Sequence, residues 1–252
     1  MSEFALTIKT DVKDLTAHLN RLQRREIRFA SALAITRTAQ DVRTDLYQNM
    51  LNVFDRPTKY VVPTNIVDPK KKGSLYLIPA EKDNLEAEVY IKNLRLGQAP
   101  AWDYLQPQVE GGARKPKGSE QSLRGTGVIG GGQFISPSTQ SPYGHVRLNK
   151  YGNVSAGQMQ KILSGLHSLR GLPRGAQSRQ KSRYFAMPKK GGRTATGIWE
   201  RDGKKLKKLF NVTSQPYYRK RFRFYQVAEA SAMKHFRRNF QKSLNQALAT
   251  AR

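Results

Sequence analysis

Cysteine is absent from this 252-residue chain, which excludes disulfides, thiolate catalysis and cysteine-ligated metal sites. Long apolar runs are absent too, since no stretch approaches the roughly 18–20 consecutive apolar residues that a membrane-spanning helix needs. The N-terminus also lacks the charged-then-apolar pattern of a signal segment. We therefore expect a protein that is made in a cytoplasm and has no membrane span.

Clusters of catalytic or metal-ligating side chains are also missing. The four histidines stand singly, without companions at metal-ligand spacing: His18, His145, His167 and His235. Glu86 and Glu88 share the solvent face of a predicted strand, where charge is expected without any catalytic role. Residues 125–130 match the dinucleotide-binding glycine pattern in letters, but no hydrophobic strand precedes them and no helical pattern follows. We expect no enzymatic activity, cofactor or metal.

Positive charge dominates the composition, with a formal net charge of +27. Residues 174–252 hold 21 Lys or Arg against three acids, a net charge of +18, so the first 173 residues contribute +9. Such a basic segment indicates a polyanionic partner, either nucleic acid or an acidic protein surface. A solvated basic face without a specific partner is the alternative.

Two long amphipathic helices are predicted at the ends of the chain. The first runs from about Asp14 to Asn52 without Pro or Gly, and Pro57 ends it. The second is expected to open at Pro216 and to bury one apolar face. The residues of that face are Tyr218, Phe222, Tyr225, Met233, Phe236, Phe240, Leu244 and Leu248. We expect the two helices to pack against each other.

The segments between these helices predict antiparallel strands. Residues 4–8 and 85–91 alternate between apolar and polar side chains, and Asp202-Gly203 is a strong hairpin signal. Ser155 and Gln158 form a capping-box pair before a short helix. We predict an α+β fold, an antiparallel β-sheet or sandwich flanked by the long N-terminal and C-terminal amphipathic helices.

The predicted organisation has three parts. Residues 1–96 hold the long helix and the first strands, and residues 151–252 complete the same domain with the capped helix, strands, hairpin and C-terminal helix. Residues 97–150 are rich in Gly, Pro, Ser and Gln and lose periodicity, which predicts a long extended arm. This arm is either ordered only against neighbouring subunits or disordered.

Basic and aromatic residues alternate at the start of the C-terminal element. Arg219, Lys220, Arg221 and Arg223 are interleaved with Tyr218, Phe222, Phe224 and Tyr225, and Arg237 and Arg238 follow. One interpretation is a nucleic-acid surface of basic and stacking groups. The other places the aromatics in the core and the bases on the wet side of an amphipathic helix.

Several sequence blocks together resemble the tailed-phage and prophage minor tail protein Z family, which is related to tail-completion and head–tail joining proteins. The blocks are Arg37-Thr38-Ala39, Val53-Phe54-Asp55-Arg56-Pro57-Thr58, Pro79-Ala80, Gly97-x-x-Pro100-Ala101, Tyr104-Leu105-x-Pro107-Gln108-Val109, Gly111-Gly112 and Tyr151-Gly152-Asn153-Val154-Ser155-x-Gly157-Gln158. The resemblance spans most of residues 15–250.

The resemblance implies a virion structural protein of the tail or neck, made in the host cytoplasm and without catalytic residues. It implies a homo-oligomeric ring around the path of the genomic DNA, next to other connector or tail proteins. We expect subunit contacts at Phe54, Pro57, Trp102, Tyr104 and Phe134. We expect non-specific DNA or acidic-surface contacts at Arg219, Lys220, Arg221, Arg223, Arg237 and Arg238. The alternative is a free basic nucleic-acid-binding protein.

Overall fold

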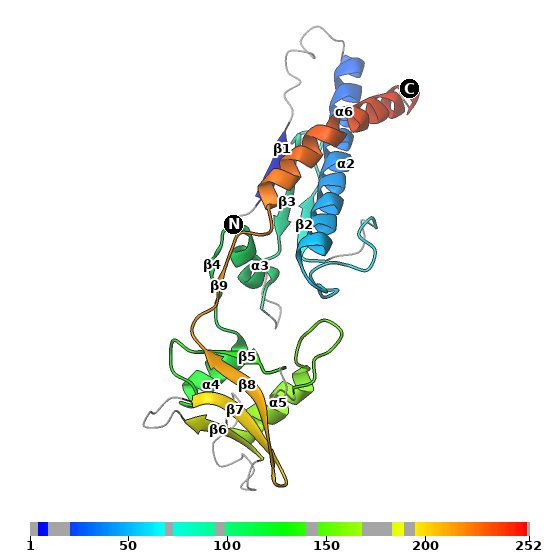
Figure 1. The fold of residues 1–252 in the computed structure, drawn as a ribbon. Helices are drawn as coiled ribbons and strands as arrows, with labels where there is room; N and C mark the ends of the chain where they lie inside the picture. The colour runs from blue at the N-terminus through cyan, green and yellow to red at the C-terminus, as the bar shows by residue number, and fades with distance from the viewer. Residues whose placement is uncertain are drawn as a thin grey trace. The chain divides into compact units, whose positions relative to one another are not determined.

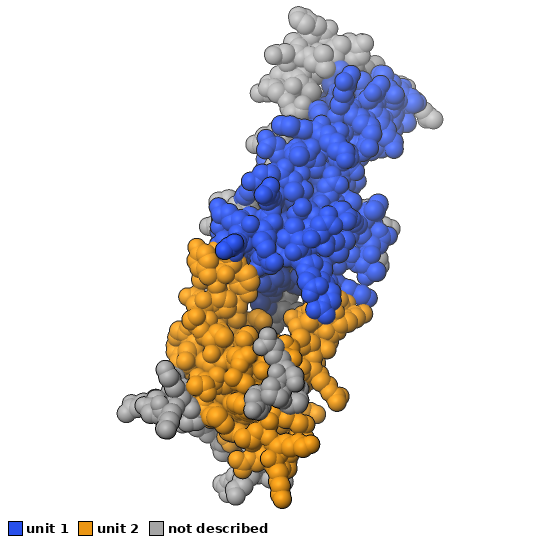
Figure 2. Space-filling model, viewed as in Figure 1, with its two compact units in different colours: residues 1–111, 219–252 blue, residues 112–218 orange. Residues whose placement is uncertain are grey.

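The chain forms two compact units in a computed structural model, and Figure 2 colours them separately. The model describes residues 5–9, 21–68, 73–93, 99–139, 146–167, 183–188 and 195–250. Unit 1 combines residues 1–111 with residues 219–252, and unit 2 consists of residues 112–218. The predicted helix start near Asp14 and the linker predicted at 174–182 lie outside the described residues.

Unit 1 packs two long helices on a three-stranded antiparallel sheet (Figure 1). The strands β1 (Ala5–Lys9), β2 (Leu75–Ile78) and β3 (Glu86–Ile91) are ordered β1-β3-β2. The helices α2 (Arg21–Val53) and α6 (Phe224–Thr250) cover one face of this sheet. Leu46 of α2, Val89 of β3 and Phe224 of α6 are all buried in the same core.

Helix α2 ends where the sequence predicts. The amide of Phe54 still donates to the carbonyl of Met50 (2.9 Å), and Arg56 then takes a left-handed backbone conformation (φ 46°) just before Pro57. Proline restricts the residue before it to non-helical conformations, so the helix cannot continue. The chain then turns, with the amides of Val61 and Val62 donating to the carbonyl of Thr58.

Residues 97–150 differ from the predicted extended arm. They include α3 (Ala101–Val109), β4 (Gly112–Ala113), α4 (Gly118–Gly125) and β5 (Phe134–Pro137). These helices have eight or nine residues, too short to give a clear periodic signal. The described part of the segment is therefore folded within the chain, with α3 in the core of unit 1 and the other elements in unit 2.

Unit 2 is built around a four-stranded antiparallel sheet of order β5-β8-β7-β6. Besides β5, this sheet contains β6 (Tyr184–Pro188), β7 (Ala195–Asp202) and β8 (Lys205–Thr213). The same unit contains α4 and α5 (Ala156–Gly165). The predicted hairpin is confirmed, because Asp202 pairs with Lys205 and Gly203 takes a φ of 59°. The Ser155 half of the predicted capping box is also confirmed, since its side chain accepts from the Gln158 amide.

A second, two-stranded sheet joins the beginning and the end of unit 2. Strand β4 pairs with β9 (Tyr217–Tyr218), so Gly112 lies opposite Tyr218 and Ala113 opposite Tyr217. Helix α6 therefore begins at Phe224, later than the predicted opening at Pro216, because the intervening residues are extended. The predicted α+β class with long helices near both ends is confirmed, whereas the three predicted segments do not coincide with the two units.

Candidate functional site

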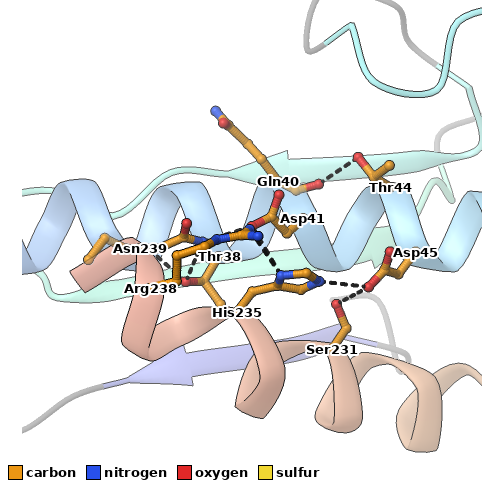
Figure 3. A network of polar contacts seen from close by, with 10 residues as sticks. Thr38, Gln40, Asp41, Thr44, Asp45, Ser231, His235, Arg238 and Asn239 are labelled. Carbon is orange, nitrogen blue, oxygen red and sulfur yellow. Dashed lines mark hydrogen bonds and ion pairs between the residues drawn. The ribbon is translucent and has the colours of Figure 1, made fainter. Parts of the chain in front are cut away.

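Helices α2 and α6 meet through a network of polar side chains (Figure 3). Asp45 accepts from the Ser231 hydroxyl (Oδ2–Oγ 2.7 Å), and its Oδ2 lies 3.2 Å from His235 Nε2. One turn away, Asp41 Oδ2 accepts from Asn239 Nδ2 at 2.8 Å. Arg238 Nη2 lies 3.1 Å from the same Asp41 oxygen and 3.0 Å from His235 Nδ1. These contacts fix how one helix is aligned along the other.

The network continues toward the C-terminal end of α6. Asn239 also donates to Thr38 Oγ1 (3.2 Å). Arg37 donates from Nη1 to Ser243 Oγ at 2.8 Å and from Nη2 to Gln246 Oε1 at 2.6 Å. Ser243 is fully buried and Asn239 is 5% exposed. Buried polar groups need such partners, because an unmade hydrogen bond costs about 1–3 kcal/mol.

The buried face of α6 agrees with the predicted apolar one only in part, since Phe222 is in the core and Phe236 packs against it. Its fully enclosed residues are small or polar after the first turn: Phe224, Ala228, Ser231, Asn239, Ser243 and Ala247. Two residues of the predicted apolar face point to solvent instead, with Met233 73% exposed and Leu248 62% exposed. Small polar residues recur every three or four positions along α6 and lie opposite the acids of α2. This spacing marks the buried face of the helix, and a search for apolar periodicity alone misses it.

The six basic residues predicted to contact DNA or an acidic surface fall into two groups. Arg221 and Arg238 hold the fold: Arg221 donates to Gln108 Oε1 from Nε (3.2 Å) and Nη2 (3.0 Å), and Arg238 contacts Asp41. All six are exposed, and the Arg238 side chain is 66% exposed, but no side-chain contact is described for Arg219, Lys220, Arg223 and Arg237. Only this second group is available to a polyanion without breaking a contact described in the structure.

The aromatic residues near these bases do not form a stacking platform. Phe222 is 1% exposed and Phe224 is fully buried, and their rings contact each other edge to face at 5.8 Å. Tyr217 is 79% exposed and Tyr225 39% exposed. Phe222 and Phe224 are therefore not available to stack on bases, and the aromatic groups left exposed beside the basic residues are these two tyrosines.

The predicted interface residues lie mostly inside the protomer. Trp102 (6% exposed) belongs to the core of unit 1, and Phe134 (2% exposed) is buried in unit 2. Phe54 packs against Phe222 with ring centroids 5.9 Å apart, and Tyr104 lies 6.4 Å from the ring of Tyr60. These contacts correct the prediction for Trp102 and Phe134, because each is already enclosed by its own chain. Pro57 is half-buried.

A second polar cluster, in unit 2, surrounds the fully buried carboxylate of Glu120. Arg114 donates to both of its oxygens, at 2.7 and 2.5 Å, and the amides of Lys117 and Ile135 donate at 2.7 and 3.1 Å. Burial alone would raise the pKa of Glu120, but these hydrogen bonds outweigh it and lower the pKa. The carboxylate is thus held ionised as a structural centre.

Phe134 lies beside this carboxylate cluster, which explains its burial. The guanidinium carbons of Arg114 and Arg124 lie 4.7 and 4.6 Å from the centroid of its ring. Arg124 also donates to the Gln133 carbonyl from Nε (3.1 Å) and Nη2 (2.7 Å). Sequence patterns did not indicate this arrangement, because Arg114, Glu120 and Phe134 are spread over a segment without periodicity.

The described side chains do not assemble a metal site or a membrane helix. Over the ranges that the structure places, no group of three or more His, Asp or Glu is arranged to hold a metal ion. Among the same residues, no helix combines the length and apolar character needed to cross a bilayer. What the helix pair does offer is a rigid element that carries exposed bases next to exposed apolar side chains.

The residues that carry the family resemblance occupy structural positions. Arg37 and Thr38 join α2 to α6. The Gln108 carbonyl accepts from the amides of Arg221 and Phe222 (both 2.9 Å), and Ser155 caps α5. Comparison with models of protein families, with curated proteins and with solved structures finds no match for this chain.

Proposed function

We propose that this chain is a structural protein of a tailed-phage virion, located at the head–tail junction or in the upper tail. In this proposal identical subunits form a closed ring around the DNA path, next to other connector or tail proteins. Basic residues that face the lumen neutralise phosphates without reading sequence. The protein has no catalytic task in this role, and its rigid elements set the geometry of the ring.

The observation that supports this proposal best is that some basic residues of unit 1 make contacts within the fold and others do not. Arg221 contacts Gln108 of α3 and Arg238 contacts Asp41 of α2, whereas Arg219, Lys220 and Arg223, on the short segment between β9 and α6, are exposed and make no described side-chain contact. A rigidly mounted row of exposed bases suits a surface that DNA slides past, because non-specific phosphate contacts bind without fixing a register.

The positions of the resemblance blocks support the same conclusion. Gln108 makes backbone and side-chain hydrogen bonds to the segment that carries the bases, so its block anchors this segment. The Phe54–Thr58 block packs one aromatic ring on Phe222 and turns the chain after α2. Each of these residues maintains a shape, as expected for a structural protein.

Electron microscopy and light-scattering mass of the full-length chain test the proposal, alone and in purified particles. We expect a closed ring with a central opening and a mass that is an integral multiple of 28.5 kDa. A chain that remains monomeric at all concentrations and is absent from particles would refute the proposal.

The role of the exposed bases is tested by charge reversal. We expect the double variant Arg219→Glu/Arg223→Glu to lower the DNA content of particles without loss of folding, because neither side chain is part of a described contact. Lys204→Glu/Lys205→Glu, in the β7–β8 turn and at the first residue of β8, is the matched control, since it changes the net charge equally at exposed positions in unit 2. Normal genome content in the first variant contradicts a lumenal role for these bases.

A free nucleic-acid-binding protein is the second candidate, and the exposure of the same bases favours it. This function predicts tight binding of purified protomers to DNA with a steep salt dependence, because log affinity falls by roughly 0.9 per phosphate contact for each tenfold rise in salt. Weak DNA binding by protomers together with ring formation would separate the first function from the second.

A further inference from the structure

The three-stranded sheet of unit 1 has a second face that the helices do not cover. Strand β3 alternates, so that Ala87, Val89 and Ile91 enter the core while the residues between them point away from it. Strand β2 alternates in the same way. The outward residues form what we call the outer sheet face: Tyr76, Ile78, Glu86, Glu88 and Tyr90. Tyr76 is 39% exposed and Ile78 42% exposed.

This outer sheet face combines apolar surface with negative charge. The rings of Tyr76 and Tyr90 contact each other at 5.4 Å, and Glu88 lies opposite Ile78 in the register. The turn between β2 and β3 carries the exposed acids Glu81 and Asp83 with the exposed base Lys82 between them, a net charge of −1. Lys9 of β1 lies opposite Glu86 in the register, whereas Glu88 lies between Thr7 and Ile78, so Glu88 is the acid of this face without a base opposite it.

The opposite combination occurs on the solvent side of α6. Residues at helical spacing form what we call the outer α6 face: Met233, Arg237, Phe240, Leu244 and Leu248. Met233 and Leu248 are mostly exposed, Phe240 stacks on Phe236 at 5.9 Å, and Lys234 adds a second exposed base nearby. The exposed acid Glu229 lies four residues before Met233, so the bases of this face are at Arg237 and toward the C-terminal end, and its N-terminal end is acidic.

The two faces suit each other and cannot meet within one protomer. One lies on the strand layer of unit 1 and the other on the helix layer, and the core separates them (Figure 1). Each presents apolar side chains beside charge, with acids on the sheet and bases on the helix. Apolar contact supplies the association energy, and opposite charges set its specificity.

We propose that the outer sheet face of one subunit binds the outer α6 face of a second copy of this chain, with Glu88 facing Arg237. The interface joins two different surfaces, so it is heterologous and leaves one of each free at the ends of a dimer. Repetition of the contact produces a ring or a filament. The inference builds on the proposed function, for which it identifies the subunit contact.

Charge-swapped variants test this pairing through the mass of the full-length chain in solution. We expect Glu88→Arg and Arg237→Glu each to weaken self-association at least about tenfold, because each places like charges in every contact. In an equimolar mixture of the two variants, every contact between unlike chains pairs opposite charges, so association should return. The double variant Glu88→Arg/Arg237→Glu should also associate, since the pair is restored in reversed order.

Two controls keep this test independent of folding and of overall charge. Glu110→Arg and Lys204→Glu change the same charges at exposed positions off both faces and should assemble like the wild type. Circular dichroism should show unchanged helix content in all variants, because Glu88 and Arg237 lie outside the core.

The outcomes separate the two proposals. If the wild type associates and both single variants associate equally well, the assigned interface is wrong while the ring proposal stands. Failure of the mixture and of the double variant to associate would likewise overturn the Glu88–Arg237 pairing. If the wild type itself remains monomeric and is absent from particles, the proposed function fails together with the contact.

Discussion

Neutralising Glu120 should weaken unit 2 severely, and Glu120→Gln is the smallest change that does so. Four donors converge on the two carboxylate oxygens: two guanidinium N–H groups of Arg114 and the amides of Lys117 and Ile135. A glutamine keeps one oxygen and turns an NH₂ group toward donors at the other position. It also leaves the charge of Arg114, whose side chain is 12% exposed, without its partner.

The expected cost follows from these lost contacts. Removing one member of a buried ion pair costs about 3–5 kcal/mol. A domain of this size has a total stability of roughly 5–15 kcal/mol, so much of the free energy of unfolding would be lost. At about 4–8 °C per kcal/mol, the melting temperature of unit 2 should fall by roughly 12–40 °C.

The two tryptophans allow each unit to be followed separately. Trp102 belongs to unit 1 and Trp199 to unit 2, and the chain contains no other. In a Trp102→Phe background, fluorescence during urea unfolding reports on unit 2 alone. Glu120→Gln should lower the midpoint in this background, whereas Lys204→Gln at an exposed position of unit 2 should leave it unchanged. A loss below about 0.5 kcal/mol, the usual range for surface changes, would refute the reasoning.

The pH dependence of the same variant gives an independent check. The pKa of Glu120 is lowered in the folded chain, so its contribution to stability is complete above the unfolded pKa of about 4.3 and is lost as the pH falls through the folded pKa. Glu120→Gln has no carboxyl group at this position. The difference in unfolding free energy between wild type and variant should therefore shrink as the pH falls below about 4.3.

Three further predictions concern packing and alignment. Gly73→Ala should lower the urea midpoint of unit 1, because an added Cβ would lie 2.6 Å from Pro63 Cδ and 2.7 Å from Tyr47 Oη. The fluorescence of Trp102 in a Trp199→Phe background measures this midpoint, and an unchanged value contradicts the prediction. Asn239→Ala should cost unit 1 about 1–3 kcal/mol in the same assay, since it removes donors to Thr38 and Asp41, whereas Lys242→Ala on the exposed side of α6 should cost less than 0.5 kcal/mol. Gly203→Ala should destabilise unit 2 by about 1 kcal/mol because of the φ of 59°, and equal melting curves would refute this.

Local signals in the sequence predicted much of the fold. Asp202-Gly203 specifies a hairpin through backbone conformation, and Ser155 specifies a helix start through a hydrogen bond to its own neighbours. Both depend on residues close in the chain. The absence of Gly and Pro predicted the long helix, and Pro57 its end, for the same reason.

Features that depend on distant partners were missed. Ser231, Asn239 and Ser243 are buried because Asp45, Thr38 and Arg37 face them, a match that counting apolar residues cannot find. The start of α6 shifted because Tyr217 and Tyr218 pair with residues more than one hundred positions earlier in the chain. The sequence indicated which basic residues the candidate site contains. It did not indicate that Arg221 contacts Gln108 and that Arg238 contacts Asp41, because these partners are distant in the chain.

The β4–β9 pair has a consequence for biosynthesis. Unit 2 is an insertion whose two ends lie side by side, and unit 1 is completed only by residues 219–252. The ribosome, at ~5–20 residues per second, therefore delivers all of unit 2 before the helix that covers Leu46 and Met50 of α2 exists. For several seconds the nascent chain carries a complete unit 2 after an amphipathic helix whose contacts with α6 are still missing, the kind of exposed apolar surface that chaperones bind.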